Sequence, residues 1–192
     1  LGGKSPVIVS DSSNIDITAR RVMFNKTLNA GQICLAPDYV YVHETEKDNF
    51  VDACKIQVNK FYTDLKYNPD YTSVINQKHY DRLNGLLSDA KDRGAELVEI
   101  NPANEDFTQQ ESHKIPPTLV LNPTDDMQIM KEEIFGPLLP IKTYKDIDEP
   151  ITYINKHDKP LGLYYFGNNK NEEAAVVNST SSCGFTINDI MG

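Results

Sequence analysis

Residues 6–43 read PVIVSDSSNIDITARRVMFNKTLNAGQICLAPDYVYVH, and this stretch decides the fold class. It begins with a short apolar run, residues 6–10, and ends with a β-branched and aromatic run, residues 39–43, and both runs are typical of buried strands. Between them, the polar cluster at residues 11–14 can start a helix, apolar residues then recur at helical spacing, and residues 29–31 break the pattern. A strand, a helix and a second strand in this order favour parallel pairing of the two strands.

The same alternation continues along the chain. We expect further strands at residues 95–100, 118–121, 138–144, 163–167 and 185–188. Helical patterns cover residues 50–65, 75–90, 149–156 and 172–179. The polar segment 101–114 has no pattern and is interpreted as a surface loop. This order predicts an α/β fold in three layers, with a largely parallel sheet and helices on both of its faces.

Local signals mark the ends of two of these helices. Thr45 together with Asp48 can cap the helix that follows residue 45. Arg93-Gly94 is the basic residue and glycine expected after the helix at 75–90. Asn84-Gly85 lies inside that helix and is a turn signal that conflicts with the periodicity. We give the periodicity precedence and expect an unbroken helix.

The composition is that of an ordinary globular chain. Of its 192 residues 39% are hydrophobic and 24% charged, which is enough for a substantial core and unlike a disordered sequence. The 19 basic and 28 acidic side chains give a net charge of −9, which argues against nucleic acid or an anionic membrane as the main partner. No stretch approaches the ~18 consecutive apolar residues of a membrane span, so we expect no membrane contact from this segment.

The chain has three cysteines at wide spacing, Cys34, Cys54 and Cys183. An odd number at such spacing suits neither a disulfide framework nor a zinc site, and it favours a reducing compartment of the cell. The histidines show no paired metal-ligand spacing, so we expect no bound metal. Cys54 falls on an apolar helix face and is interpreted as a core residue, and Cys183 as a residue packed at the start of a strand.

Cys34 is the candidate nucleophile. It ends the run NAGQIC at residues 29–34, after a predicted helix and before a predicted strand. A loop there can hold the sulfur at the rim of a cleft, near backbone N–H groups that favour the thiolate. The alternative is a buried packing residue, as free cysteines often are, and the context alone leaves both interpretations open.

A second candidate site is the run EEIFGP at residues 132–137. An acid, a spacer, an aromatic residue and a Gly-Pro turn can present the Glu133 carboxylate and the Phe135 ring from one loop. Carboxylate oxygens accept hydrogen bonds from diols such as ribose hydroxyls, and the ring supplies an apolar wall. The alternative is a solvated acidic loop with one buried phenylalanine.

Together these motifs resemble the catalytic domain of an aldehyde dehydrogenase. LGGKSP at residues 1–6, NAGQIC at 29–34 and EIFGP at 133–137 stand in the order expected of that family, and the resemblance covers nearly the whole chain. CLAPDY at residues 34–39 and KPLGLY at 159–164 resemble the class 3, or fatty aldehyde dehydrogenase, branch in particular.

The resemblance implies an NAD(P)-dependent oxidation of an aldehyde to a carboxylic acid through a cysteine thiohemiacetal and thioester. Cys34 matches the family's nucleophile. Glu133 matches the residue that binds the nicotinamide-ribose hydroxyls, and Phe135 the residue that packs beside that ribose. Leu1 and Gly2 match positions whose backbone approaches the nicotinamide. The implied cofactor is NAD or NADP, the implied substrate an aliphatic or fatty aldehyde, and the whole protein a homodimer.

Residues 1–192 match only the catalytic domain of that family. The family's general-base Glu would directly precede Leu1, and the N-terminal cofactor-binding domain and C-terminal tail would lie outside the chain. We therefore expect the chain alone to be inactive, and any anchor to an intracellular membrane to lie in that tail. Two alternatives stay open: a non-catalytic or assembly role for a retained fold, and an acylating relative that transfers the acyl group to an acceptor other than water.

Overall fold

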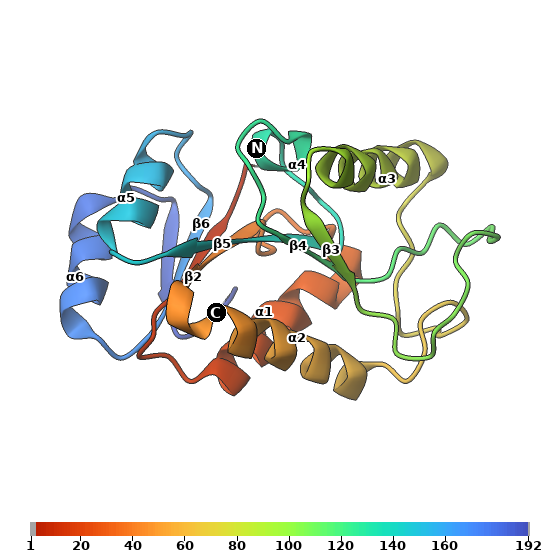
Figure 1. The fold of residues 1–192 in the computed structure, drawn as a ribbon, viewed down its shortest axis with the longest axis horizontal. Coiled ribbons are helices and arrows are strands. Elements are labelled where there is room, and N and C mark those ends of the chain that lie inside the picture. The colour runs from red at the N-terminus through yellow and green to blue at the C-terminus, as the bar shows by residue number, and fades with distance from the viewer. Residues whose placement is uncertain (1–2, 192) are drawn as a thin grey trace.

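The computed structural model describes residues 3–191, which form a seven-stranded sheet covered by helices on both faces (Figure 1). The strands are β1 (Pro6–Val9), β2 (Tyr39–His43), β3 (Glu96–Glu99), β4 (Thr118–Leu121), β5 (Leu138–Tyr144), β6 (Gly162–Phe166) and β7 (Gly184–Ile187). The α-helices are α1 (Ile15–Thr27), α2 (Lys47–Phe61), α3 (Gln77–Asp92), α4 (Gln128–Lys131), α5 (Asp148–Asn155) and α6 (Lys170–Ser179). Short 3₁₀ turns η1 (Leu28–Gly31) and η2 (Glu44–Glu46) follow α1 and precede α2.

The strand order is β3-β4-β5-β2-β1-β6-β7. Every neighbouring pair is parallel except β3 and β4, which are antiparallel. In the register, Val7 of β1 lies opposite Val40 of β2 on one side and Tyr164 of β6 on the other. The sheet confirms the prediction of a largely parallel α/β fold.

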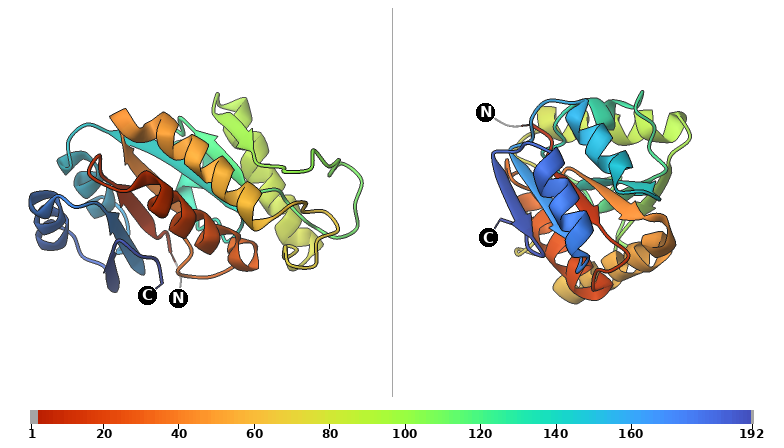
Figure 2. Two further views of the ribbon diagram at one scale, coloured as in Figure 1. Left: turned by 90° about the horizontal axis from the view of Figure 1, so that it is seen from below. Right: turned by 90° about the vertical axis from the view of Figure 1, so that its left-hand side faces the viewer.

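Successive strand residues point to opposite layers. In β1, Val7 and Val9 pack in the core beneath α1 and α2, whereas Ile8 packs in the core shared by α3, α4, α5 and α6. In Figure 1 α1 and α2 lie below the sheet, and the left view of Figure 2 shows them side by side across it. Because helices cover both faces, the central strands are apolar along their length, as is typical of buried parallel strands.

Helix ends largely follow the sequence signals. The Asn14 side chain caps α1 by accepting a hydrogen bond from the Ile17 N–H. α3 runs unbroken through Gly85 and is followed by Gly94 with a positive φ of 95°. Periodicity thus outweighs the turn signal, as predicted. Among residues 3–191, no helix is both long and apolar enough to cross a bilayer.

Two local predictions are wrong. Thr45 does not cap α2: the chain first makes the turn η2, where the Thr45 hydroxyl bonds to His43, and Glu46 then precedes the helix without a side-chain cap. Cys183 is exposed rather than packed. It lies just before β7, an outer strand whose residues are exposed or half-buried, so the strand start offers little core to pack against.

Candidate functional site

The segments that lead into β1, β2 and β5 meet at one edge of the sheet, because these strands are parallel neighbours. Lys4 lies ahead of β1, Cys34 ahead of β2 and Glu133 ahead of β5. β2 is the middle strand of the three, with a partner about 4.8 Å away on each side. The sheet therefore brings together motifs that are far apart in the sequence.

The chain reverses sharply between α1 and Cys34, in what we call the cysteine loop (residues 29–38). Asn29 and Ala30 adopt left-handed backbone conformations with φ of 51° and 53°, and Gly31 follows with φ 70°. Left-handed residues end the helix and turn the chain away from its axis. Cys34 then lies exposed in the turn before β2, which does not fit the alternative of a buried packing residue.

Hydrogen bonds hold the cysteine loop on both sides of the thiol. Gln32 donates from Nε2 to the Ser73 carbonyl at 3.0 Å and accepts at Oε1 from the Ile75 N–H at 2.9 Å. The Tyr164 hydroxyl of β6 donates to the Leu35 carbonyl at 2.8 Å. The loop is thus fixed by a neighbouring segment and by the sheet.

The second motif forms an acidic loop (residues 132–137) after the single turn of α4. The Ile134 side chain is fully buried and anchors it, whereas Phe135, with φ 49°, leaves 40% of its surface exposed. Arg82 of α3 donates hydrogen bonds to the carbonyls of Glu133 and Ile134. These contacts fix the backbone, and Glu133 is half-buried beside the exposed ring.

The two loops touch through glycines. A Cβ on Gly31 would overlap the Gly136 carbonyl, with the carbonyl carbon at 2.7 Å, and would lie 3.0 Å from the Lys26 carbonyl oxygen. A Cβ on Gly136 would lie 2.7 Å from Cδ1 of Leu83. Side chains do not pack this closely against backbone, so the approach of the two loops requires glycine at position 31, whereas glycine at 136 makes room for the Leu83 side chain of α3.

Buried charges lie beneath the loops. Asp38 is 4% exposed, pairs with Lys4 through Oδ1 and accepts the Ile134 N–H at Oδ2 at 3.0 Å. Lys26 is 1% exposed and donates from Nζ to the Pro37 carbonyl at 2.7 Å. Burial lowers the pKa of Lys26 to about 8, although the nearby Asp38 carboxylate acts to raise it.

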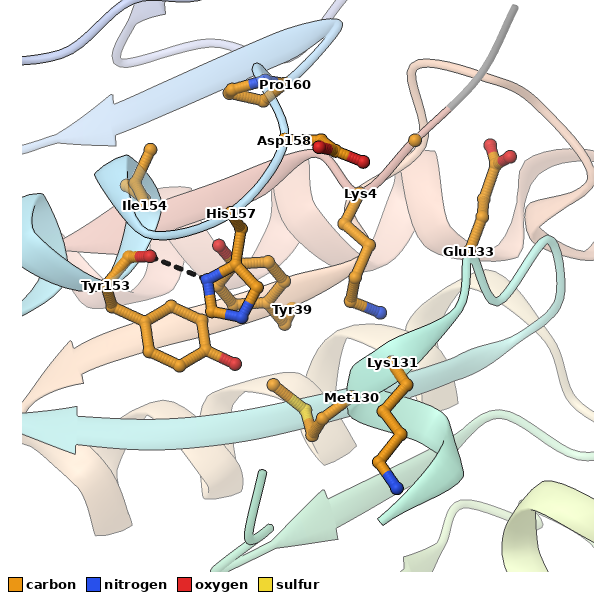
Figure 3. A pocket seen from close by; sticks show the side chains of 11 residues that line it. Lys4, Tyr39, Met130, Lys131, Glu133, Tyr153, Ile154, His157, Asp158 and Pro160 are labelled. Atoms are coloured by element: carbon orange, nitrogen blue, oxygen red, sulfur yellow. Dashed lines mark hydrogen bonds between the residues drawn. The ribbon is translucent and has the colours of Figure 1, made fainter. Parts of the chain in front are cut away.

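A pocket of about 240 Å³ opens beside the acidic loop (Figure 3). It is lined by Gly3, Lys4, Tyr39, Met130, Lys131, Glu133, Tyr153, Ile154, His157, Asp158 and Pro160. In Figure 3 the Glu133 side chain points away from Lys4 and Lys131, and no hydrogen bond joins it to the other side chains drawn. Its carboxylate is therefore placed to accept hydrogen bonds from a ligand. Cys34 is not among the lining residues.

The structure thus places Cys34, Glu133 and Phe135 on two touching loops, and their chemical roles stay predictions. Leu1 and Gly2, the other two predicted cofactor contacts, lie outside the described residues. Cys54 is buried on α2, as predicted, and burial raises the pKa of its thiol. Within residues 3–191, no group of three or more His, Cys, Asp or Glu side chains is arranged to hold a metal ion.

Sequence reasoning missed the side chains that hold the loops in place. Lys4 and Asp38 belong to the motifs LGGKSP and CLAPDY, but nothing in the sequence indicates that their side chains form an ion pair. Gln32 likewise belongs to NAGQIC without any sign of its partners. Arg82 carries no signal beyond a charge on a helix.

Comparison with known proteins identifies one family. Residues 1–192 match the sequence profile of the Aldehyde dehydrogenase family. A "Probable coniferyl aldehyde dehydrogenase" of Caulobacter vibrioides is 53% identical over 191 residues, covering 100% of this chain and 39% of the relative. "Aldehyde dehydrogenase family 3 member A2" of Rattus norvegicus is 37% identical over 192 residues, covering 100% of this chain and 38% of the relative.

A solved structure gives the same result. The substrate-bound state of Staphylococcus aureus AldH matches with a TM-score of 0.90 and 41% identity, covering 100% of this chain and 40% of that one. Another rat relative, "Aldehyde dehydrogenase, dimeric NADP-preferring", is 35% identical over 192 residues, which is 100% of this chain and 40% of the relative. The chain therefore spans about two fifths of the length of the relatives it matches.

Proposed function

Since the chain belongs to the aldehyde dehydrogenase family, we propose that the protein containing it oxidises an aldehyde to a carboxylic acid with NAD or NADP. Residues 1–192 supply the catalytic-domain portion, and the cofactor-binding domain lies elsewhere in that protein. One observation carries the proposal: an exposed cysteine lies on a loop that touches, through Gly31 and Gly136, the loop bearing Glu133 and Phe135.

The chemistry begins at the Cys34 sulfur. As a thiolate it attacks the aldehyde carbonyl carbon, so that a C–S bond forms and the carbonyl oxygen becomes an oxyanion. The backbone N–H of Cys34 is a donor for that oxyanion. Loss of hydride from the same carbon leaves a thioester on Cys34, and water cleaves its C–S bond to release the acid and the thiol. Water activation falls to the family's general base outside this chain.

We assign the acidic loop to the nicotinamide ribose. Bound NAD or NADP would supply the hydride acceptor. Glu133 presents a carboxylate free of the neighbouring lysines, which can accept hydrogen bonds from two ribose hydroxyls. The Phe135 ring, 40% exposed, offers an apolar surface beside it. With the ribose held in this way, the two residues would keep the bound cofactor beside the cysteine loop.

Substitution of the thiol tests the proposed nucleophile. Cys34→Ser keeps the side-chain shape but gives a far weaker nucleophile at neutral pH, so aldehyde-dependent NADH or NADPH formation should be abolished. Cys183→Ser is the control for loss of an exposed thiol, because Cys183 is also exposed but precedes the outer strand β7 and belongs to neither loop. Activity of Cys34→Ser within about tenfold of the unmodified protein would refute the assignment.

Substitution of the carboxylate tests cofactor binding. Glu133→Gln keeps the shape but loses charge-assisted hydrogen bonds, which are roughly twice as strong as neutral ones. The KM for the cofactor should rise and single-turnover hydride transfer should slow. Glu132→Gln is the control, since its exposed pair with Arg82 at 3.6 Å contributes little. An unchanged rate of hydride transfer in Glu133→Gln would show that Glu133 is a solvated surface residue without a role in cofactor binding.

The substrate class is open to direct comparison. The class 3 resemblance favours a fatty aldehyde, whereas the Caulobacter relative is named for coniferyl aldehyde. We propose an apolar aldehyde and expect the ratio of kcat/KM for a long-chain aliphatic aldehyde and for coniferyl aldehyde to distinguish the two classes.

We also propose that the whole protein forms a homodimer in a reducing compartment. One rat relative is named as dimeric, and the three cysteines of this chain are free thiols. Sedimentation equilibrium of the whole protein tests the first part, and a monomer at micromolar concentration would refute it.

A further inference from the structure

We infer that Lys4 and Asp38 are positioning residues: their ion pair, partly buried at Lys4 and buried at Asp38, sets the acidic loop against the cysteine loop. The inference deepens the proposed function and rests on it, because the distance it controls is the one between the nucleophile and the ribose-binding carboxylate. The hydrogen-bonding groups of the pair are taken up by each other and by the backbone.

Asp38 is the acceptor that the two loops share. It lies in the cysteine loop between Cys34 and β2, and it is 4% exposed. Its Oδ2 accepts the Ile134 N–H at 3.0 Å, and its Oδ1 pairs with the Lys4 ammonium. The amide it holds directly follows Glu133. One carboxylate therefore ties the middle of the acidic loop to the cysteine loop.

Lys4 completes the link from the strand on the other side. Besides pairing with Asp38, its ammonium donates to the Ile129 carbonyl at 2.9 Å and to the Glu132 carbonyl at 2.8 Å. All three N–H donors of the ammonium are thereby used. Because Ile129 lies in α4 and Glu132 at its end, Lys4 fixes the start of the acidic loop as well as the carboxylate that holds its middle.

The pair is expected to act on geometry more than on stability. Buried ion pairs contribute little net stability, because the desolvation of two charges offsets their attraction. A network in which every donor and acceptor is bonded instead favours one arrangement of its parts. Lys4 and Asp38 meet this condition, and they join segments ahead of three different strands. Their main effect should be on where Glu133 lies.

The cysteine loop has further supports that do not involve the pair. Gln32 bonds to the Ser73 and Ile75 backbone, and Tyr164 bonds to the Leu35 carbonyl. Loss of the pair should therefore loosen the acidic loop, which keeps only the bonds from Arg82 to the Glu133 and Ile134 carbonyls, and leave the thiol exposed and reactive. The order of the acidic loop and the reactivity of Cys34 can therefore be measured separately, whereas a general loss of structure would change both.

Asp38→Asn in the protein that contains this chain is the first variant, since it keeps the side-chain shape and removes the charge. We expect the KM for the cofactor to rise at least ~10-fold and hydride transfer to fall about 100-fold, because small positioning errors cost rates of this order. Alkylation of Cys34 by iodoacetamide, without cofactor, should change less than about twofold. Hydrogen exchange of residues 129–137 should accelerate, because the Ile134 amide loses its charged acceptor.

A control variant and a double variant guard against general damage. Asp125 pairs with Lys142 of β5 at 2.6 Å, but its side chain is 60% exposed against 5% for Asp38, so Asp125→Asn controls for the loss of a lysine-paired carboxylate without burial. Asp125→Asn should leave the KM, the alkylation rate and the exchange of residues 129–137 unchanged. Combining Lys4→Met with Asp38→Asn removes both charges of the pair, and it should still loosen the acidic loop while Cys34 stays reactive.

The possible outcomes separate this inference from the proposed function. Unchanged exchange at residues 129–137, or equal losses in Cys34 alkylation and hydride transfer, would overturn the positioning role. If the unmodified protein oxidises no aldehyde, the proposed function fails. In that case hydrogen exchange in Asp38→Asn and its control still shows whether the pair holds the acidic loop.

Discussion

Adding one methyl group at Gly31 is the sharpest test of the contact between the two loops. In Gly31→Ala the new Cβ would overlap the Gly136 carbonyl and lie 2.7 Å from its carbon. Two costs arise. An L-residue in the left-handed region costs about 1–2 kcal/mol, which applies at the φ of 70° found here. Overpacking a site that cannot yield costs a further 1–3 kcal/mol, roughly, because the obstacle is backbone rather than a flexible side chain.

Gly94→Ala separates these two costs. Gly94 also has a positive φ, 95°, but a Cβ there would meet nothing within 4 Å. This control should therefore lose only the conformational part, about 1–2 kcal/mol of the free energy of unfolding. Gly31→Ala should lose about 2–5 kcal/mol in all, provided that the chain keeps its fold.

Urea unfolding of both variants, with slopes compared to confirm two-state behaviour, measures the difference. The larger loss in Gly31→Ala should be accompanied by a changed rate of Cys34 alkylation, because the cysteine loop can relieve the overlap only by moving away from the acidic loop. Equal destabilisation of the two variants, within about 0.5 kcal/mol, would show that the loops separate freely and would refute the close contact.

Two further predictions concern buried side chains near the site and in the core. Burial lowers the pKa of Lys26 from 10.5 to about 8, which corresponds to about 3 kcal/mol spent on keeping its charge at neutral pH. Lys26→Met removes this cost but also the hydrogen bond to the Pro37 carbonyl, so the free energy of unfolding should increase by at most about 3 kcal/mol. Between pH 8 and 10.5 the unfolded chain binds a proton at Lys26 that the folded chain has lost, so the free energy of unfolding of the unmodified chain should rise with pH relative to that of the variant. Denaturant titrations at several pH values measure this difference in stability. A difference that widens with pH would contradict the burial of this charge. Under native conditions Cys34 and Cys183 should react with iodoacetamide long before Cys54, because burial hides the Cys54 sulfur and raises the pKa of its thiol. Mass spectrometry identifies the modified cysteine, and modification of Cys54 first would contradict the exposure of Cys34.

The fold could be predicted from the sequence wherever the physical signal is local. Strand β2 matches the predicted residues 39–43, and the cap of α1 by Asn14 follows a polar cluster visible in the sequence. Errors arose where several local solutions compete. Thr45 has the right residue type for a helix cap, but the choice between a cap and a 3₁₀ turn depends on where β2 ends.

The site could be predicted only in part, for a similar reason. The motifs mark Cys34 and Glu133, since both stand in short runs of unusual composition. The contacts that fix them join residues far apart in the chain, and no local pattern encodes such a pair. Asp38 accepts a hydrogen bond from Ile134, 96 positions away, and Gln32 donates to Ser73, 41 positions away. Exposure at Cys183 was missed because the outer position of β7 depends on the strand order.

The strand order is also what makes the site possible. A parallel β-α-β unit places β1 beside β2. In contrast, β5 lies on the other side of β2 although β3 and β4 come between them in the sequence. With β2 in the middle, a residue just ahead of it is within reach of the segments ahead of both neighbours, which lie about 4.8 Å to either side. Asp38 occupies that position and bonds to Lys4 ahead of β1 and to Ile134 ahead of β5. An exchange of β5 and β6 in the sheet would keep every motif of the sequence and still separate Cys34 from Glu133. The chemistry proposed for this chain therefore depends on the central position of β2 as much as on the reactive residues themselves.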